Sequence, residues 1–241
     1  MNGNIHFFTY ATHSQGMYED LVNDFNKNHI SLNVIGWGQK WISFMDKLKG
    51  VQEEIKQLPS TDVVIVIDAF DTRMSPGYSA EKILTIYQDI FGGAGLVFSK
   101  NIHTLYGFPD FLSSYMVKRI FKGDINSGMY IGRVEDVIPV LKAAINIGDV
   151  CRGDDQLALN KVAEKFSLII DYDCKLFRNY EYYERDKDFL HHEAIFCGYP
   201  GTLSWWRLSR IPGEYLPLIF TNLWPEVLSI LILIAVIIFI I

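Results

Sequence analysis

The sequence of 241 residues predicts an α/β fold with a mostly parallel central sheet, followed by a hydrophobic C-terminal helix. Short apolar runs rich in Val and Ile alternate with longer amphipathic segments, the pattern of strands connected by helices. One run, residues 63–67, is apolar throughout, as expected of a strand buried on both faces. The last fifteen residues, 227–241, contain a single polar side chain, Ser229. We therefore expect one domain, residues 1–215, and a C-terminal segment, residues 216–241.

The same patterns place the elements in chain order. The predicted strands cover residues 5–11, 32–35, 63–67, 95–98, 125–131 and 168–171. The predicted helices cover residues 17–26, 42–57, 80–90 and 134–147. The last helix is the clearest, because its apolar residues recur every three or four positions and form one stripe.

Composition excludes some classes of protein. With 22 basic and 28 acidic residues the net charge is −6, so no broad basic field points to nucleic acid as a partner. The three cysteines, Cys151, Cys174 and Cys197, are far apart and odd in number. They indicate no disulfide framework, which favours a reducing compartment.

The two ends of the sequence differ. The N-terminus has no basic region followed by an apolar stretch and a cleavage site, so we expect no secretory signal peptide. Residues 227–241 would form a helix of about 22 Å, shorter than the ~30 Å hydrocarbon core of a bilayer. Trp224 lengthens it and suits a membrane interface. We expect a transmembrane tail anchor with the preceding domain on the cytosolic side. The alternative is a buried terminal helix or strand.

Two carboxylates, Asp68 and Asp71, follow the buried strand at residues 63–67, with Phe70 between them. Ligands of open α/β sheets bind beyond the carboxyl ends of the strands, and paired carboxylates suit a hard divalent cation. The alternative is structural, with one Asp capping a turn and the other solvated. A third possibility is a haloacid-dehalogenase-type phosphatase, but its Asp-x-Asp spacing differs from the three-residue spacing here.

Seven segments in register resemble the glycosyltransferase domain of the procollagen lysyl hydroxylases and related procollagen glycosyltransferases. They are FTYAT (residues 8–12), VIGWGQKW (34–41), VIDAFD (66–71), LVFS (96–99), INSGMYIG (125–132), DDQL (154–157) and DCKLF (173–177). Their order and spacing match the family over roughly residues 5–205.

The resemblance implies a GT-A fold, a Rossmann-like architecture for nucleotide-diphospho-sugar transferases, with a UDP-sugar donor and Mn²⁺ or another divalent cation. It implies metal ligands at Asp68, Asp71 and Cys197. It implies donor contacts at Thr9, Thr12, Trp41, Phe70, Asn126, Ser127, Gly128 and Gly198. Asp154 and Asp155 would face the transferred sugar and take part in catalysis.

The residue types suit this chemistry on their own terms. A metal held by Asp68 and Asp71 would stabilise the charge on a departing diphosphate. A carboxylate such as Asp154 or Asp155 could orient an acceptor hydroxyl or take its proton, although acidic residues there also favour the start of a helix. Phe70 offers a flat apolar surface for a base, or simply packs in the core.

The sequence departs from the family at two positions. Cys197 stands where the family has a metal-binding histidine, and a thiolate is poorly matched to Mn²⁺. His191 or His192 could substitute. Leu203 occupies the place of an expected basic residue, for which Arg207 could compensate.

The leading interpretation is a membrane-anchored, metal-dependent glycosyltransferase that moves glucose or galactose from a UDP-sugar to a hydroxyl acceptor. Hydroxylysine, another protein side chain, a glycan or a lipid could each be the acceptor. The alternative is a catalytically impaired, membrane-tethered relative that acts as a binding module.

Overall fold

A six-stranded sheet forms the centre of the computed structural model, which describes residues 3–93, 95–103, 115, 123–181, 194–200 and 224–240. Its strands lie in the order β2 (Leu32–Ile35), β1 (Ile5–Tyr10), β3 (Val63–Asp68), β6 (Ile125–Arg133), β5 (Leu96–Lys100) and β7 (Leu168–Asp171). Within this sheet β6 alone runs antiparallel to its neighbours. The predicted α/β fold with a mostly parallel sheet is therefore confirmed.

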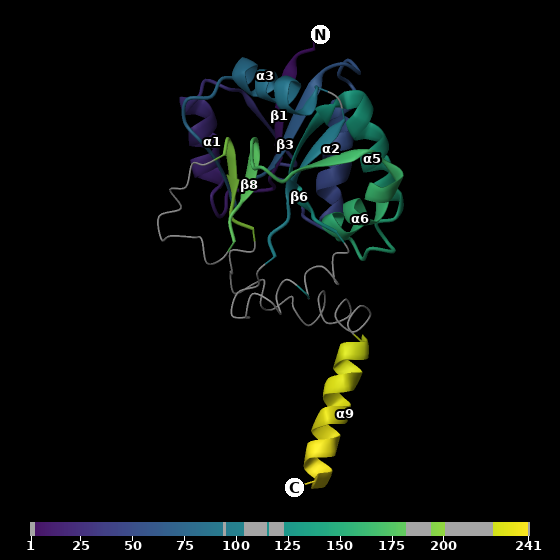
Figure 1. Cartoon of the computed structure of the whole chain (residues 1–241). Coiled ribbons are helices and arrows are strands. Elements are labelled where there is room, and N and C mark those ends of the chain that lie inside the picture. The colour runs from purple at the N-terminus through teal and green to yellow at the C-terminus, as the bar shows by residue number, and fades with distance from the viewer. Residues whose placement is uncertain are drawn as a thin grey trace. The chain divides into compact units, whose positions relative to one another are not determined.

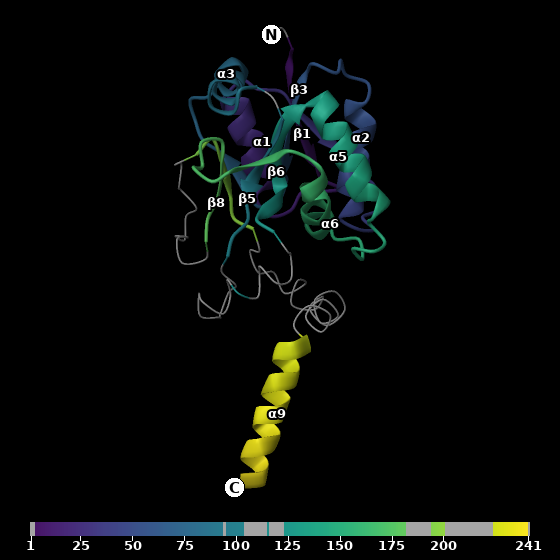
Figure 2. The ribbon, with the colours of Figure 1, turned by 45° about the vertical axis from the view of Figure 1, so that its right-hand side comes forward.

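Helices cover both faces of this sheet (Figures 1 and 2). One layer contains α1 (Tyr18–Lys27) and α3 (Ala80–Phe91), and the other contains α2 (Met45–Ile55), α5 (Val134–Asn146) and α6 (Asp155–Val162), followed by a 3₁₀ turn at Ala163–Lys165. The four predicted helices form with ends within three residues of those expected. Burial on both faces explains the apolar run of β3, whose first five residues are buried.

A second, three-stranded sheet was not predicted from the sequence. It contains β4 (Thr72–Met74), β9 (Phe196–Gly198) and β8 (Phe177–Asn179), in that order. Each strand has three residues, too few to show a period of two. Because β4 follows β3 after three residues, this sheet lies next to the carboxyl end of β3.

The start of β6 is fixed by a side chain of α6. The amide of Asn160 donates to the Ile125 carbonyl (2.9 Å), and its Oδ1 accepts from the Ile125 N–H (3.1 Å). Asn160 is buried, so it serves the first residue of β6 as a neighbouring strand would. This pair of bonds sets the position of α6 against β6.

The C-terminal helix α9 (Trp224–Ile240) belongs to a second unit, residues 103–122 and 202–241, and is described by itself. Its side chains from Leu228 to Val236 are exposed. Among the described residues no helix combines the length and the apolarity required to cross a bilayer. The 17 residues of α9 extend about 26 Å, less than the ~30 Å core. The structure therefore does not support the predicted transmembrane anchor within residues 216–241.

We predict that Asn160→Ala lowers the free energy of unfolding by about 2–4 kcal/mol, because both polar groups of Ile125 lose their partner while buried. Asn146→Ala, at an exposed position at the end of α5, is the matched control and should change it by less than ~0.5 kcal/mol. Urea unfolding measures both. Equal stability of the two variants would contradict the role of Asn160.

Candidate active site

The candidate site lies at the carboxyl ends of β1, β2 and β3. In the sheet, Tyr10 pairs with Ile35 on one side and with Asp68 on the other, so all three strands end at one level. Asp68 is the last residue of β3, and Asp71 lies between β3 and β4. As predicted, both carboxylates follow the buried strand at the edge where open α/β sheets bind ligands.

A lysine that the sequence analysis missed connects the predicted site residues. Lys47, on α2, places its Nζ 2.7 Å from Asp155 Oδ2 and 3.3 Å from Asp68 Oδ1. The same ammonium donates to the Ser127 carbonyl at 3.2 Å. The ammonium of Lys47 therefore brings together three residues that are far apart in the sequence: Asp68, Ser127 and Asp155. The sequence contains a signal for the burial of Lys47, because this residue lies four positions before the buried Val51, on the apolar stripe of its helix.

The ion pair between Lys47 and Asp155 is buried, with each side chain only 6% exposed. Burial by itself lowers the pKa of Lys47. The negative charges of Asp155 and then Asp68 raise it by more than burial lowers it, so the net pKa lies above its ordinary value. The lysine is therefore charged at neutral pH. Such a pair is costly to break, because either partner left alone is an uncompensated buried charge.

A bulge in β6 brings Asn126, Ser127 and Gly128 to this site. The register between β5 and β6 shifts between Phe98 and Ser99, which leaves the Ser127 carbonyl able to accept from Lys47. Asn126 Oδ1 accepts from the Gly128 N–H at 2.9 Å and so closes the bend. A Cβ at position 128 would lie 2.8 Å from Asp68 Oδ2, so a larger residue there would displace this carboxylate.

Asp154 and Asp155 open α6 and have different surroundings. Asp154 is the N-cap, and its Oδ1 accepts from the Leu157 N–H at 2.8 Å. Burial, and then the charge of Asp155, raise the pKa of Asp154 to about 6. Asp155 is instead held by Lys47. One carboxylate is thus poised to exchange a proton near neutral pH, and the other is fixed as a counter-ion.

Aromatic rings surround the ends of β1 and β2. The ring of Trp41 lies edge-on to Tyr10 (5.8 Å between centroids) and to Phe44 (5.3 Å). Phe70 lies 6.1 Å from the ring of His13. Trp41 and Phe70 are each partly exposed, so both keep surface for a ligand.

The two predicted threonines are differently placed. Thr9 is fully buried, and its hydroxyl donates to the Ile67 carbonyl at 2.7 Å. That hydroxyl is therefore used inside the sheet. Thr12 lies beyond β1, where its hydroxyl shares a hydrogen bond of 2.9 Å with His13 Nδ1 and its carbonyl accepts from the Gly38 N–H.

Cys197 does not join the two aspartates as a third metal ligand. It lies in β9, fully buried, with its Sγ 3.6 Å from the Ala194 carbonyl, and burial raises the pKa of the thiol. Across the described ranges, no three side chains of His, Cys, Asp or Glu are grouped as metal ligands. Carboxylate oxygens suit Mn²⁺ and a protonated thiol does not. Asp68 and Asp71 therefore fit a divalent cation, whereas Cys197 does not.

Gly198, a predicted donor contact, lies in β9 of the second sheet. Gly198 pairs with Thr72 across the second sheet, and a Cβ there would lie 2.0 Å from Asn179 Oδ1. Four residues considered in the sequence analysis lie outside the described residues: His191, His192, Leu203 and Arg207.

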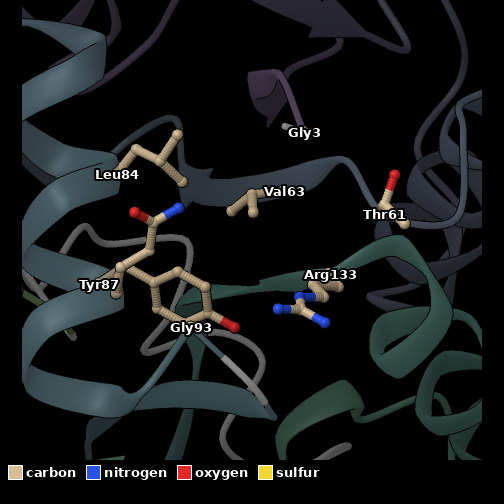
Figure 3. Close-up of a pocket in the computed structure, with 8 residues that line it drawn as sticks. Gly3, Thr61, Val63, Leu84, Tyr87, Gly93 and Arg133 are labelled. Carbon is tan, nitrogen blue, oxygen red and sulfur yellow. The ribbon is translucent and has the colours of Figure 1, made fainter. Parts of the chain in front are cut away.

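A small pocket exists elsewhere and does not overlap this site. Figure 3 shows it at the beginning of β3, where Val63, Thr61, Tyr87 and Arg133 are among its lining residues. Asp68 ends the same strand, so the pocket and the carboxylates lie toward opposite ends of β3.

Comparison with known proteins defines the class of this fold. A crystal structure of a glycosyltransferase involved in the glycosylation of the major capsid of PBCV-1 superposes with a TM-score of 0.53 at 11% identity, covering 88% of this chain and 99% of that one. At this identity the likeness concerns the fold, which is that of a glycosyltransferase. No curated protein matches the chain.

The sequence model of a protein family described as "PLOD GT domain" matches residues 1–194, which are most of the chain. The chain belongs to this family, and it is a glycosyltransferase domain. The resemblance to the procollagen lysyl hydroxylase glycosyltransferases, seen in the sequence, is thereby confirmed.

We predict that Lys47→Met lowers the free energy of unfolding by about 3–5 kcal/mol, because it strands the buried carboxylate of Asp155. Adding Asp155→Asn should recover most of this loss. Lys49→Met, which removes the same charge from an exposed position of α2, should have little effect. Thermal and urea unfolding of the four proteins measure these differences. A double variant as unstable as Lys47→Met would contradict the assignment.

Proposed function

We propose that this domain transfers a hexose, glucose or galactose, from a UDP-sugar to a hydroxyl acceptor in the presence of a divalent cation such as Mn²⁺. Hydroxylysine or glycosylated hydroxylysine is the acceptor that the family implies. The observation that carries the proposal is the meeting of Asp68, Asp155 and Ser127 at the ammonium of Lys47, at the carboxyl edge of the sheet. This edge is where open α/β folds bind nucleotides.

The donor diphosphate would be bound by positive charge. Asp68 and Asp71 would hold the cation, which when bound supplies Lewis-acid stabilisation of the diphosphate oxygens. Lys47 adds a fixed ammonium in a largely desolvated place, where it acts on developing negative charge more strongly than in water. Phe70 and Trp41 offer aromatic surface to the base and ribose.

Transfer breaks the bond between the anomeric carbon and the diphosphate oxygen, and the electron pair leaves with the diphosphate. The acceptor oxygen forms the new bond to the anomeric carbon, and its proton must go to a base. Asp154 is suited to this, because its pKa of about 6 lets it take a proton near neutral pH. Asp155 is held by Lys47 at 2.7 Å and keeps that ammonium in position.

The C-terminal helix adds a proposal about location. The apolar side chains exposed along α9 would associate with a membrane, and the glycosyltransferase domain would then face the cytosol.

The proposal is tested by calorimetric titration of UDP into the full chain, purified in detergent, with Mn²⁺ and then with EDTA. We expect binding with Mn²⁺ that EDTA abolishes. Asp68→Asn and Asp71→Asn should each reduce UDP-sugar hydrolysis or transfer by at least 100-fold, since each removes a charged ligand, while circular dichroism stays unchanged. Unchanged turnover in both variants would exclude the proposed metal-assisted reaction.

The pH dependence of transfer tests the role of Asp154. A base with a pKa of about 6 is ionised at pH 7 and protonated below pH 6, so kcat/KM should fall about tenfold per pH unit below 6. Asp154→Asn should lose this acidic limb together with at least 100-fold in rate. Asn also caps helices well.

Stability provides the control for that variant. The folded pKa of Asp154 is raised above its ordinary value of 3.8, so this carboxyl favours folding below pH 4 and loses that contribution as the pH rises through 6. Asp154→Asn should therefore be at least as stable as the parent at pH 7. An acidic limb that persists in the variant would assign the base to another group.

A second function is favoured by the position of Cys197. The thiol of Cys197 is buried against the Ala194 carbonyl, so among the described residues the site offers a cation the two carboxylates of Asp68 and Asp71. If two ligands are too few for catalysis, the domain would bind the donor without turnover. UDP binding in the calorimeter together with no hydrolysis of UDP-glucose or UDP-galactose would establish this binding module.

A further inference from the structure

Three oxygen atoms surround the ammonium of Lys47 at unequal distances. Asp155 Oδ2 lies at 2.7 Å, the Ser127 carbonyl at 3.2 Å and Asp68 Oδ1 at 3.3 Å. The contacts to Ser127 and Asp68 are hydrogen bonds, whereas the contact to Asp155 Oδ2 is an ion pair without hydrogen-bond geometry. A ligand oxygen that approaches this ammonium competes with these three oxygens for it.

Asp68 is the partner most easily released. Its contact is the longest, and its side chain is 38% exposed, against 6% for Asp155, so water can replace the lysine at its carboxylate. Ser127 offers a backbone carbonyl inside a strand and cannot withdraw without moving β6. The ammonium is thus anchored by the ion pair with Asp155 and the hydrogen bond to Ser127, and its hydrogen bond to Asp68 is the one that a ligand can replace.

The position of Lys47 opposes a second cation at Asp68. A charge 3.3 Å from a carboxylate oxygen, on a side chain that is almost fully buried, is weakly screened by solvent. A divalent cation that approaches Asp68 therefore meets the ammonium as a like charge. The lysine cannot move away, because its other two partners hold it.

We propose that Lys47 makes cation binding conditional on the donor: a nucleoside diphosphate takes the place of Asp68 at the ammonium of Lys47 and frees Asp68 for the divalent cation. The inference rests on the proposed function and adds the order in which the site fills. Without a diphosphate the ammonium lies beside the carboxylate of Asp68 and weakens the binding of the cation there. With a diphosphate the negative charge of the phosphates offsets the ammonium, and the two ligands strengthen each other's binding equally.

The experiment measures the affinity of Mn²⁺ alone and with UDP, from the electron paramagnetic resonance signal of free Mn²⁺ added to the full chain in detergent. The informative comparison is Asp155→Asn against Lys47→Met/Asp155→Asn, because the two proteins differ by the lysine alone. We expect Mn²⁺ without UDP to bind at least tenfold more tightly to the double variant. The enhancement of Mn²⁺ affinity by UDP should shrink by a similar factor.

Two controls separate this effect from others. Lys49→Met removes a positive charge from the exposed face of the same helix and should leave the Mn²⁺ affinity within twofold of the parent. Lys47→Arg keeps the charge and should keep the weak binding of Mn²⁺ alone. If the double variant does not melt cooperatively, Lys47→Gln/Asp155→Asn replaces it, because two amides can bond to each other.

The outcomes distinguish the inference from the proposed function. Equal Mn²⁺ affinity in Asp155→Asn and the folded double variant overturns the inference, even if UDP binds as expected. Failure of UDP to bind under any condition overturns the proposed function and the coupling to the donor. In that case, tighter Mn²⁺ binding by the double variant would still show that Lys47 competes for Asp68.

Discussion

The buried ion pair between Lys47 and Asp155 is the interaction on which the arrangement of this site depends. It joins α2 to the start of α6 across one face of the sheet. Burying two charges is expensive, and an apolar pair of similar size would often stabilise the fold as well or better. The pair therefore matters for what it holds in place: the ammonium of Lys47 beside Asp68, and the N-terminus of α6, where Asp154 lies.

The bulge in β6 makes this position of the lysine possible. In a strand without irregularity the carbonyl groups would be engaged along the ladder. The bulge in β6 instead leaves the Ser127 carbonyl to Lys47. Gly128 in the same bend leaves space for the carboxylate of Asp68, which a larger residue would displace. Asn160 fixes the first residue of the strand from α6, the helix that also carries Asp155. The hydrogen bonds to the backbone of β6 and the ion pair between Lys47 and Asp155 therefore fix the same arrangement of α6 against β6.

The sequence predicted what periodicity and motif order encode. The main strands and four helices follow from apolar spacing, and Asp68 and Asp155 from segments whose order resembles a known family. Lys47 was missed because a charged residue on a helix is ordinarily assigned to solvent, and its buried partner lies 108 positions away. The direction of β6 was not predictable, since neither its length nor its composition distinguishes it from a parallel strand. Cys197 was assigned from the order of motifs, whereas packing in β9 turns its thiol toward Ala194.

The balance of charge at the site changes when a donor binds. Asp68, Asp71 and Asp155 carry three negative charges, against the single positive charge of Lys47. A nucleoside diphosphate adds further negative charge at the same edge of the sheet, and one ammonium cannot offset both. A divalent cation held by Asp68 and Asp71 would restore the balance, because carboxylate oxygens suit such an ion. In the part of the chain that the structure describes, no third ligand is grouped with these two carboxylates, so we expect the cation to depend on the donor for tight binding.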